Sequence, residues 1–283
     1  MGACEIGIPK ILHFVWLSKK DAEAKDIHHL FCNNALKTAA LIDLSAENWI
    51  INLWVDQKSQ VLPKVKELES NGFNIKNIYE ESLFEREANL LDPSNSLYQK
   101  QIFDESYNLG IRIDIVKYQV LKKYGGIVND FNFVYERLPT EEELNSSSLI
   151  LYKVQRSFKL ESYPENCFMA TTPEHPFIKE VQVGVVNKAA NEDFCLSKNP
   201  KFPQDTLNLL QSKLPGFSEQ ESRSKKIYCT SITIDPVGEI DLSKFLGVII
   251  TKVYQEICYS EHCFGYDALF SDGTLLQQTW LEI

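Results

Sequence analysis

The segment from Arg112 to Val134 constrains the fold more than any other part of the chain. It reads R-I-D-I-V-K-Y-Q-V-L-K-K-Y-G-G-I-V-N-D-F-N-F-V. The apolar spacing of its first half predicts a helix, and the Gly125-Gly126 pair is a typical helix end. The apolar run after the glycines predicts a short strand that extends through Asp130 to Asn132. Because two glycines connect these elements, we expect the chain to reverse there and to bring side chains of both together.

Two pairs of polar side chains each share one face of this expected helix or strand. Asp114 and Lys117 are three residues apart, so they share one face of the helix, with Tyr118 beside them. Asp130 and Asn132 are two residues apart, so they share one face of the strand. Hard divalent cations prefer such oxygen ligands and often bind phosphate oxygens as well. The segment therefore predicts a site for a divalent metal and a phosphorylated sugar.

Each of these pairs also has a simpler interpretation. An acid and a base three residues apart on a helix often form only a solvated ion pair, worth about 0.2–0.5 kcal/mol. Asp130 and Asn132 would, in the same view, only open a surface turn. The presence of both pairs around a glycine pair at this spacing favours the site.

This segment resembles the signature of glycosyltransferases with the DxD motif, a group that includes outer-chain mannosyltransferases and the glucosyltransferase domains of large bacterial cytotoxins. The signature reads D-x-x-R-(Y/x)-x-x-L-x-x-x-G-G-x-Y-x-D-x-D. The residues that match it are Asp114, Leu121, Gly125, Gly126 and Asp130. Three residues depart from it: Lys117 replaces the Arg, Val128 the Tyr and Asn132 the second Asp.

The resemblance implies a GT-A-like α/β fold, with a mostly parallel sheet flanked by helices, and a UDP- or GDP-linked sugar as donor. It implies that Asp114 binds hydroxyls of the donor sugar and that Lys117 contacts the sugar or a phosphate. Asp130 and Asn132 would hold Mn²⁺ or Mg²⁺. Asp114, Lys117 and Asp130 together form the expected catalytic set, and transfer with retention of configuration is expected.

Further donor contacts are expected from residues outside the charged group. Trp16, in H-F-V-W-L-S, resembles the tryptophan that stacks on the nucleotide base in toxin-like members. Asn129, next to Asp130, belongs to the same expected donor-binding set. Trp280 resembles the late tryptophan that closes over the donor. Trp16 as a core residue and Trp280 as an anchor for the chain end are the alternatives.

Composition limits the class of partner and compartment. The net charge of −10 disfavours binding to nucleic acid or to an anionic membrane surface. The sequence contains no apolar run of membrane-spanning length, and its start lacks the features of a secretory signal. Its seven cysteines include no C-x-x-C pair, which favours reduced thiols. We expect a soluble cytoplasmic protein, or one delivered into a host cell without a visible signal peptide.

The order of elements predicts a parallel sheet, because strands and helices alternate in the first part of the chain. A single domain over residues 1–283 is expected, with peripheral insertions near 80–108 and 191–224. Strands are expected at 8–16, 49–55, 73–79, 148–154, 227–234 and 248–253. Helices are expected at 21–40, 62–70, 139–144 and 173–188.

Together these features predict a metal-dependent glycosyltransferase with an unknown acceptor, which is a protein, a glycan or a lipid. Two other functions remain open. A degenerate relative would keep the fold and bind a nucleotide or a protein partner without transferring sugar. A Mg²⁺-dependent phosphohydrolase would use Asp130 and further acids at the edge of the sheet.

Overall fold

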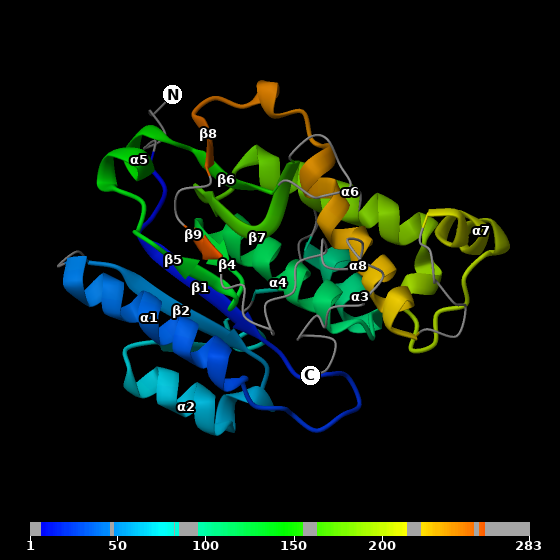
Figure 1. Ribbon diagram of the computed structural model, residues 1–283, viewed down its shortest axis with the longest axis horizontal. Helices are drawn as coiled ribbons and strands as arrows, with labels where there is room; N and C mark the ends of the chain where they lie inside the picture. Colours follow the sequence, from blue (N-terminus) through cyan, green and yellow to red (C-terminus); the bar gives the residue numbers. More distant parts are fainter. Residues whose placement is uncertain are drawn as a thin grey trace.

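A twisted sheet covered by helices on both faces forms the body of the protein, as seen in a computed structural model (Figure 1). The structure describes residues 7–45, 48–81, 83–84, 96–154, 163–213, 222–251 and 255–257. Within these ranges the main sheet has seven strands in the order β3-β2-β1-β4-β7-β6-β8, and β5 and β9 form a second, small sheet.

The strands are β1 (Ile11–Trp16), β2 (Ile50–Val55), β3 (Asn74–Asn77), β4 (Gly126–Asn129), β5 (Phe133–Tyr135), β6 (Leu149–Val154), β7 (Tyr163–Thr171), β8 (Val248–Thr251) and β9 (Gln255–Ile257). The α-helices are α1 (His29–Ser45), α2 (Pro63–Ser70), α3 (Ser96–Glu105), α4 (Leu109–Tyr124), α5 (Glu141–Ser146), α6 (Pro176–Asn191), α7 (Gln204–Lys213) and α8 (Ser222–Glu239). Short 3-10 helices lie at Ser59–Val61, Asp193–Leu196 and Leu242–Lys244.

The first half of the main sheet is parallel, as the element order predicts. β1 pairs in parallel with β2 and β4, and β2 pairs in parallel with β3. β7 is antiparallel to both of its neighbours, β4 and β6. Parallel strands need helical crossovers, which place helices on both faces of the sheet.

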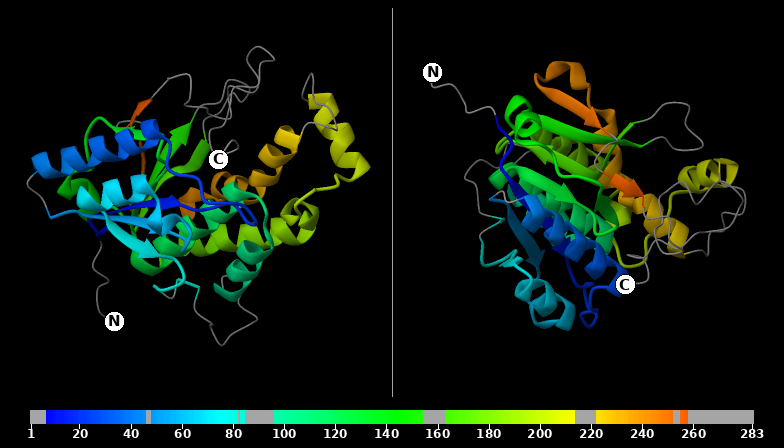
Figure 2. Two further views of the ribbon diagram at one scale, coloured as in Figure 1. Left: turned by 90° about the horizontal axis from the view of Figure 1, so that it is seen from below. Right: turned by 60° about the vertical axis from the view of Figure 1, so that its left-hand side comes forward.

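Side chains that alternate along β1 and β4 divide the core into two layers. Val15 and Val128 point toward α3, α4, α6 and α8 and belong to one apolar cluster. Phe14 and Ile127 point to the opposite face, where α1 and α2 pack in a second cluster. Figure 2 shows α7, in yellow, at the outer end of the helical layer and away from the sheet.

The predicted helix before the glycine pair is α4, and its two ends are fixed by specific residues. Asn108 caps the start, because its Oδ1 accepts hydrogen bonds from the Gly110 and Ile111 backbone N–H groups. Gly125 ends the helix with φ 63°, and Gly126 follows with φ 83°. Both angles lie in the region that glycine adopts without steric cost.

The strand after the glycines is shorter than predicted. β4 ends at Asn129, and Asp130 begins a tight turn in which the Phe133 N–H bonds to the Asp130 carbonyl at 2.9 Å. Asn132 lies in this turn and not two positions along a strand from Asp130. The chain turns here because it leaves the main sheet and enters β5 of the small sheet.

Three other predictions were wrong in their elements or bounds. Residues 227–234, expected to form a strand, are part of α8. Cys229, Ile232 and Val237 of this helix are buried, and the helix packs against α4, α6 and β7. Tertiary packing therefore overrides the strand preference of the β-branched residues. The first helix begins at His29 and not near residue 21, where Asp21 adopts the left-handed conformation with φ 58°. β7 was missed, since Pro164 and Asn166 weaken its strand signal.

His13 ties the glycine reversal to the parallel strands. The Trp54 indole N–H can only donate a hydrogen bond, and its nitrogen lies 3.0 Å from His13 Nδ1. His13 Nδ1 is therefore the acceptor, and Nε2 carries the ring proton. Nε2 then donates to the Gly125 carbonyl at 3.1 Å. The ring is fully buried with a hydrogen bond at each nitrogen, so His13 is a structural histidine.

No described helix is both long and apolar enough to cross a lipid bilayer. The single domain and the two peripheral insertions remain predictions. The described part of the first insertion, α3, buries Ile102 and Phe103 in the core cluster around α4.

We predict that Gly126→Ala destabilises the protein more than Gly72→Ala does. A methyl group at Gly126 would lie 2.6 Å from the Ile11 carbonyl oxygen, in addition to the strain of φ 83°. Gly72 has φ 90° but nothing within 4 Å, so its substitution carries only the backbone strain, about 1–2 kcal/mol. Urea unfolding measures both free energies, and equal losses would contradict a close contact at Gly126.

Stability is expected to fall between pH 7 and pH 5. Burial lowers the pKa of His13 to about 3, so the folded protein keeps the ring neutral while the unfolded chain binds a proton below about 6.5. The unfolded state gains protons as the pH falls, which corresponds to about 2 kcal/mol at pH 5. Burial also lowers the pKa of His175, to about 4, and acts in the same direction.

Unfolding free energies at the two pH values, for wild type and His13→Gln, test this effect. The variant should be less stable at pH 7 and should lose less on acidification. If the variant does not fold, a ring NMR titration of wild type replaces it. A His13 signal that titrates near pH 6.5 would contradict the assignment.

Candidate functional site

The carboxyl ends of β1, β2, β3 and β4 meet at one edge of the sheet because these strands are parallel. Ligands in open α/β sheets gather at such an edge. Two features lie there: a charged group that follows β4 and a pocket that follows β1, β2 and β3.

The charged group consists of Asp114, Lys117 and Asp130, with the lysine in the middle. Lys117 Nζ donates to Asp114 Oδ1 at 3.2 Å and also to Asp130 Oδ1. The exposed fractions of the three side chains are 9% for Asp114, 3% for Lys117 and 35% for Asp130. One buried cation therefore joins two carboxylates, of which only Asp130 is substantially open to solvent.

Charge and burial act against each other in this group. Burial by itself would lower the pKa of Lys117, but the Asp130 and Asp114 carboxylates outweigh it and raise that pKa above its ordinary value. The ammonium is therefore retained at neutral pH. Burial raises the pKa of Asp114, while Lys117 and the Thr233 hydroxyl act in the opposite direction.

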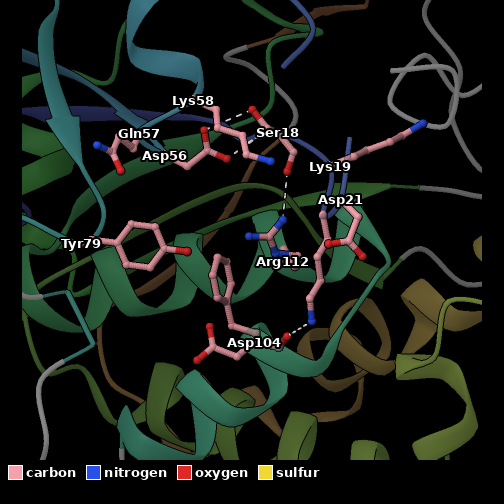
Figure 3. A pocket seen from close by; sticks show the side chains of 11 residues that line it. Ser18, Lys19, Asp21, Asp56, Gln57, Lys58, Tyr79, Asp104 and Arg112 are labelled. Atoms are coloured by element: carbon pink, nitrogen blue, oxygen red, sulfur yellow. Dashed lines mark hydrogen bonds between the residues drawn. The ribbon is translucent and has the colours of Figure 1, made fainter. Parts of the chain in front are cut away.

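The pocket has a volume of about 320 Å³ and is open to solvent (Figure 3). Its lining residues are Ser18, Lys19, Lys20, Asp21, Asp56, Gln57, Lys58, Tyr79, Phe103, Asp104 and Arg112. These residues follow β1, β2 and β3 or lie on α3 and α4. A volume of this size is within the range of small-molecule sites, about 300–1,000 Å³.

Arg112 and Asp56 both bind the backbone of Ser18 in the pocket wall. Arg112 Nη1 donates to the Ser18 carbonyl at 2.9 Å, and its guanidinium lies 4.4 Å from the centre of the Phe103 ring. The Asp56 carboxylate accepts from the Ser18 N–H and the Ser59 N–H, each at 2.8 Å. Figure 3 shows the Arg112 guanidinium in the middle of this space. No sequence pattern predicted the pocket, because its residues come from separate segments.

The other residues predicted for donor or metal binding have different surroundings. Asn129 is 1% exposed, and its Oδ1 accepts from the Tyr135 hydroxyl at 3.2 Å. Trp16 is 4% exposed, donates to the Lys25 carbonyl at 3.0 Å and packs edge-on against Phe131. Trp16 is therefore a core residue, and its ring could stack on a base only if the side chains that cover it moved away. Trp280 lies outside the described residues.

The oxygen ligands near Asp130 suit only one mode of metal binding. No group of three or more His, Cys, Asp or Glu residues in the described ranges could hold a metal ion by itself. The Asp130 carboxylate is partly exposed, and the partly buried Asn132 follows in the same turn. Mg²⁺ commonly binds one or two carboxylates, waters and substrate phosphates, and this donor set fits that mode.

Comparisons with known proteins concern the fold. No protein-family model matches the sequence, and no curated protein is similar to it. The UDP-bound glycosyltransferase domain from the YGT toxin has a TM-score of 0.53 at 11% identity, with 88% of this chain and 80% of that chain covered. The ligand-free form of that domain has a TM-score of 0.50 at 10% identity, covering 88% and 81%.

A third structure, titled PaToxG glycosyltransferase, has a TM-score of 0.49 at 17% identity and covers 84% of this chain and 82% of that chain. Identities this low establish the fold alone. The expected GT-A-like α/β fold is confirmed by the similarity to the toxin domain. The resemblance to outer-chain mannosyltransferases and the roles of the individual site residues remain predictions.

We predict that Lys117→Met lowers the free energy of unfolding by about 3–5 kcal/mol, because it leaves the buried Asp114 without its counter-charge. Adding Asp114→Asn should recover part of the loss. Lys179→Met is the matched control: it removes an ion pair to Glu174 of 3.0 Å in which both side chains are exposed, and should cost less than about 1 kcal/mol. Similar losses in chemical denaturation for the two single variants would contradict a buried charge group.

Proposed function

We propose that the protein is a glycosyltransferase that moves a sugar from a UDP- or GDP-linked donor to an acceptor. The observation that carries the proposal is the Asp114–Lys117–Asp130 group beside an open pocket at the carboxyl edge of the parallel strands. The similarity in fold to a toxin domain titled as a UDP-bound glycosyltransferase supports it.

The donor would lie along this edge, with its nucleoside in the pocket and its sugar near Asp130. Tyr79 is 53% exposed and offers an aromatic surface within the pocket. The Tyr79 ring is therefore better placed for a base than the buried Trp16 ring, and such stacking contributes about 1–3 kcal/mol per base.

The chain's own residues would divide the remaining work. Lys117 holds the Asp130 carboxylate in place and balances its charge, so that one oxygen remains available at the surface. Asp114, whose side chain is 9% exposed, would accept hydrogen bonds from hydroxyls of the donor sugar through the remaining lone pairs of its carboxylate. Asp130, with Asn132 and the donor diphosphate, would hold Mn²⁺ or Mg²⁺, and the ion would neutralise the charge of the departing diphosphate.

The acceptor is proposed to be a protein, a glycan or a lipid, and retention of the anomeric configuration is proposed by analogy with the resembling enzymes. Action as an effector on a host protein agrees with the toxin domains that share the fold. Product analysis by NMR would establish the anomeric configuration once an acceptor is found.

We predict that Asp130→Asn reduces donor hydrolysis by about a hundredfold or more, because it removes the only charged oxygen that the group presents to solvent. A panel of UDP- and GDP-sugars with Mn²⁺ or Mg²⁺ is incubated with wild type, and nucleotide release is measured. Asp205→Asn, on α7, is the matched control for loss of a carboxylate at the surface. Wild-type turnover by Asp130→Asn would exclude Asp130 from the reaction.

The same preparations distinguish the two alternative functions. Binding of a nucleotide sugar by calorimetry without turnover of any donor would support a degenerate relative, for which the engagement of Asp130 by Lys117 is the favouring observation. Release of phosphate from simple phosphate esters would instead support a phosphohydrolase.

A further inference from the structure

A closed ring of hydrogen bonds surrounds the Asp114 carboxylate and joins α4 to α8 and β7. Asp114 Oδ2 accepts from Thr233 Oγ1 at 2.7 Å. The Thr233 backbone carbonyl accepts from the Tyr118 hydroxyl at 2.7 Å, and that hydroxyl accepts from Asn166 Nδ2 at 3.2 Å. Lys117 Nζ closes the ring by donating to the Asn166 carbonyl at 3.5 Å and to Asp114 Oδ1 at 3.2 Å.

The hydroxyl proton of Thr233 has two candidate acceptors. Oγ1 lies 3.0 Å from the Thr230 carbonyl oxygen, which is the ordinary acceptor for a threonine inside a helix, and 2.7 Å from Asp114 Oδ2. A hydroxyl has one proton and cannot serve both fully. The shorter distance and the negative charge favour Asp114, since bonds to ionised acceptors are shorter and stronger.

Helix packing alone does not require a threonine at this position. Thr233 is 0% exposed, and its buried neighbours on α8 include Ile232 and Val237. Valine has the same shape as threonine without a hydroxyl, and burial of a hydroxyl is unfavourable unless it is hydrogen-bonded. The buried hydroxyl is satisfied by its short bond to Asp114.

We infer that Thr233 is a positioning residue for the transfer reaction, which fixes the Asp114 carboxylate in the orientation that meets the donor sugar. The inference rests on the proposed function for the role of Asp114. Lys117 holds one oxygen of that carboxylate and Thr233 holds the other, so the carboxylate cannot rotate. Thr233 is fully buried and acts through Asp114 without touching the donor. Fixing a reacting group through its neighbours is a common requirement for precise geometry.

The test compares Thr233→Val, which removes the hydroxyl, with Thr233→Ser, which keeps it. Thr230→Val is the matched control, because it removes another buried hydroxyl one turn earlier on the same helix. The donor is the nucleotide sugar that wild type hydrolyses fastest in the panel, and kcat and KM are measured for each variant. Circular dichroism and thermal unfolding confirm that each variant is folded.

Thr233→Val should lower kcat about tenfold to a hundredfold, as expected for loss of a supporting hydrogen bond, and should change KM by less than about threefold. Thr233→Ser should keep kcat within about threefold of wild type, and so should Thr230→Val. An unchanged kcat in Thr233→Val would overturn the inference. Equal losses in Thr233→Ser and Thr233→Val would also overturn it, because packing and not the hydroxyl would then matter.

A spectroscopic measurement separates failure of this inference from failure of the proposed function. In protein with ¹³C-labelled aspartate, the Asp114 carboxyl signal at pH 7 should shift in Thr233→Val and stay near its wild-type position in Thr233→Ser and Thr230→Val. An unshifted signal in Thr233→Val overturns the positioning role whether or not a donor is found. A wild type that turns over no donor overturns the proposed function, and the Asp114 signal still decides whether Thr233 controls that carboxylate.

Discussion

The reversal of the chain at Gly125 and Gly126 is the constraint on which the site depends. From Lys117 to Gly125 the helix covers about 12 Å, and from Gly126 to Asp130 the strand covers about 13 Å, so the two legs of the reversal have nearly equal lengths. That equality brings Lys117 Nζ to the Asp130 carboxylate. His13 holds the turning point by its bond to the Gly125 carbonyl, and any side chain at Gly126 would collide with β1.

The reversal has an electrostatic consequence. Two carboxylates brought together at a buried position repel each other, and an unpaired buried charge is costly. Lys117 resolves the conflict by contacting both, and the remaining oxygen of Asp114 is satisfied from α8 by Thr233. The group is therefore buried on its inner side and open to solvent mainly at Asp130. A buried inner side with one exposed carboxylate suits a site that orients a charged ligand at the surface.

The pocket and the charged group share an edge because the strands that end there are parallel. β1, β2 and β3 supply the loops that line the pocket, and β4 leads to Asp130. Arg112 and Lys117 both lie on α4, so one helix contributes a cation to each feature. This arrangement places the pocket and the exposed Asp130 carboxylate at one edge of the sheet, where the proposed donor would extend from one to the other.

The sequence was enough to predict α4, its glycine end and the parallel order of the first strands, because these depend on local periodicity and on backbone preferences. It also identified Asp114, Lys117 and Asp130 as a group, because residue spacing fixes how far apart they lie along a helix and a strand. Long-range packing settled three points that the sequence did not: residues 227–234 are helical, Asn132 lies in a turn, and Trp16 is covered by Phe131. The pocket and the ring of hydrogen bonds through Thr233 also depend on long-range packing. Each joins segments far apart in the chain, and their contacts leave no local pattern in the sequence.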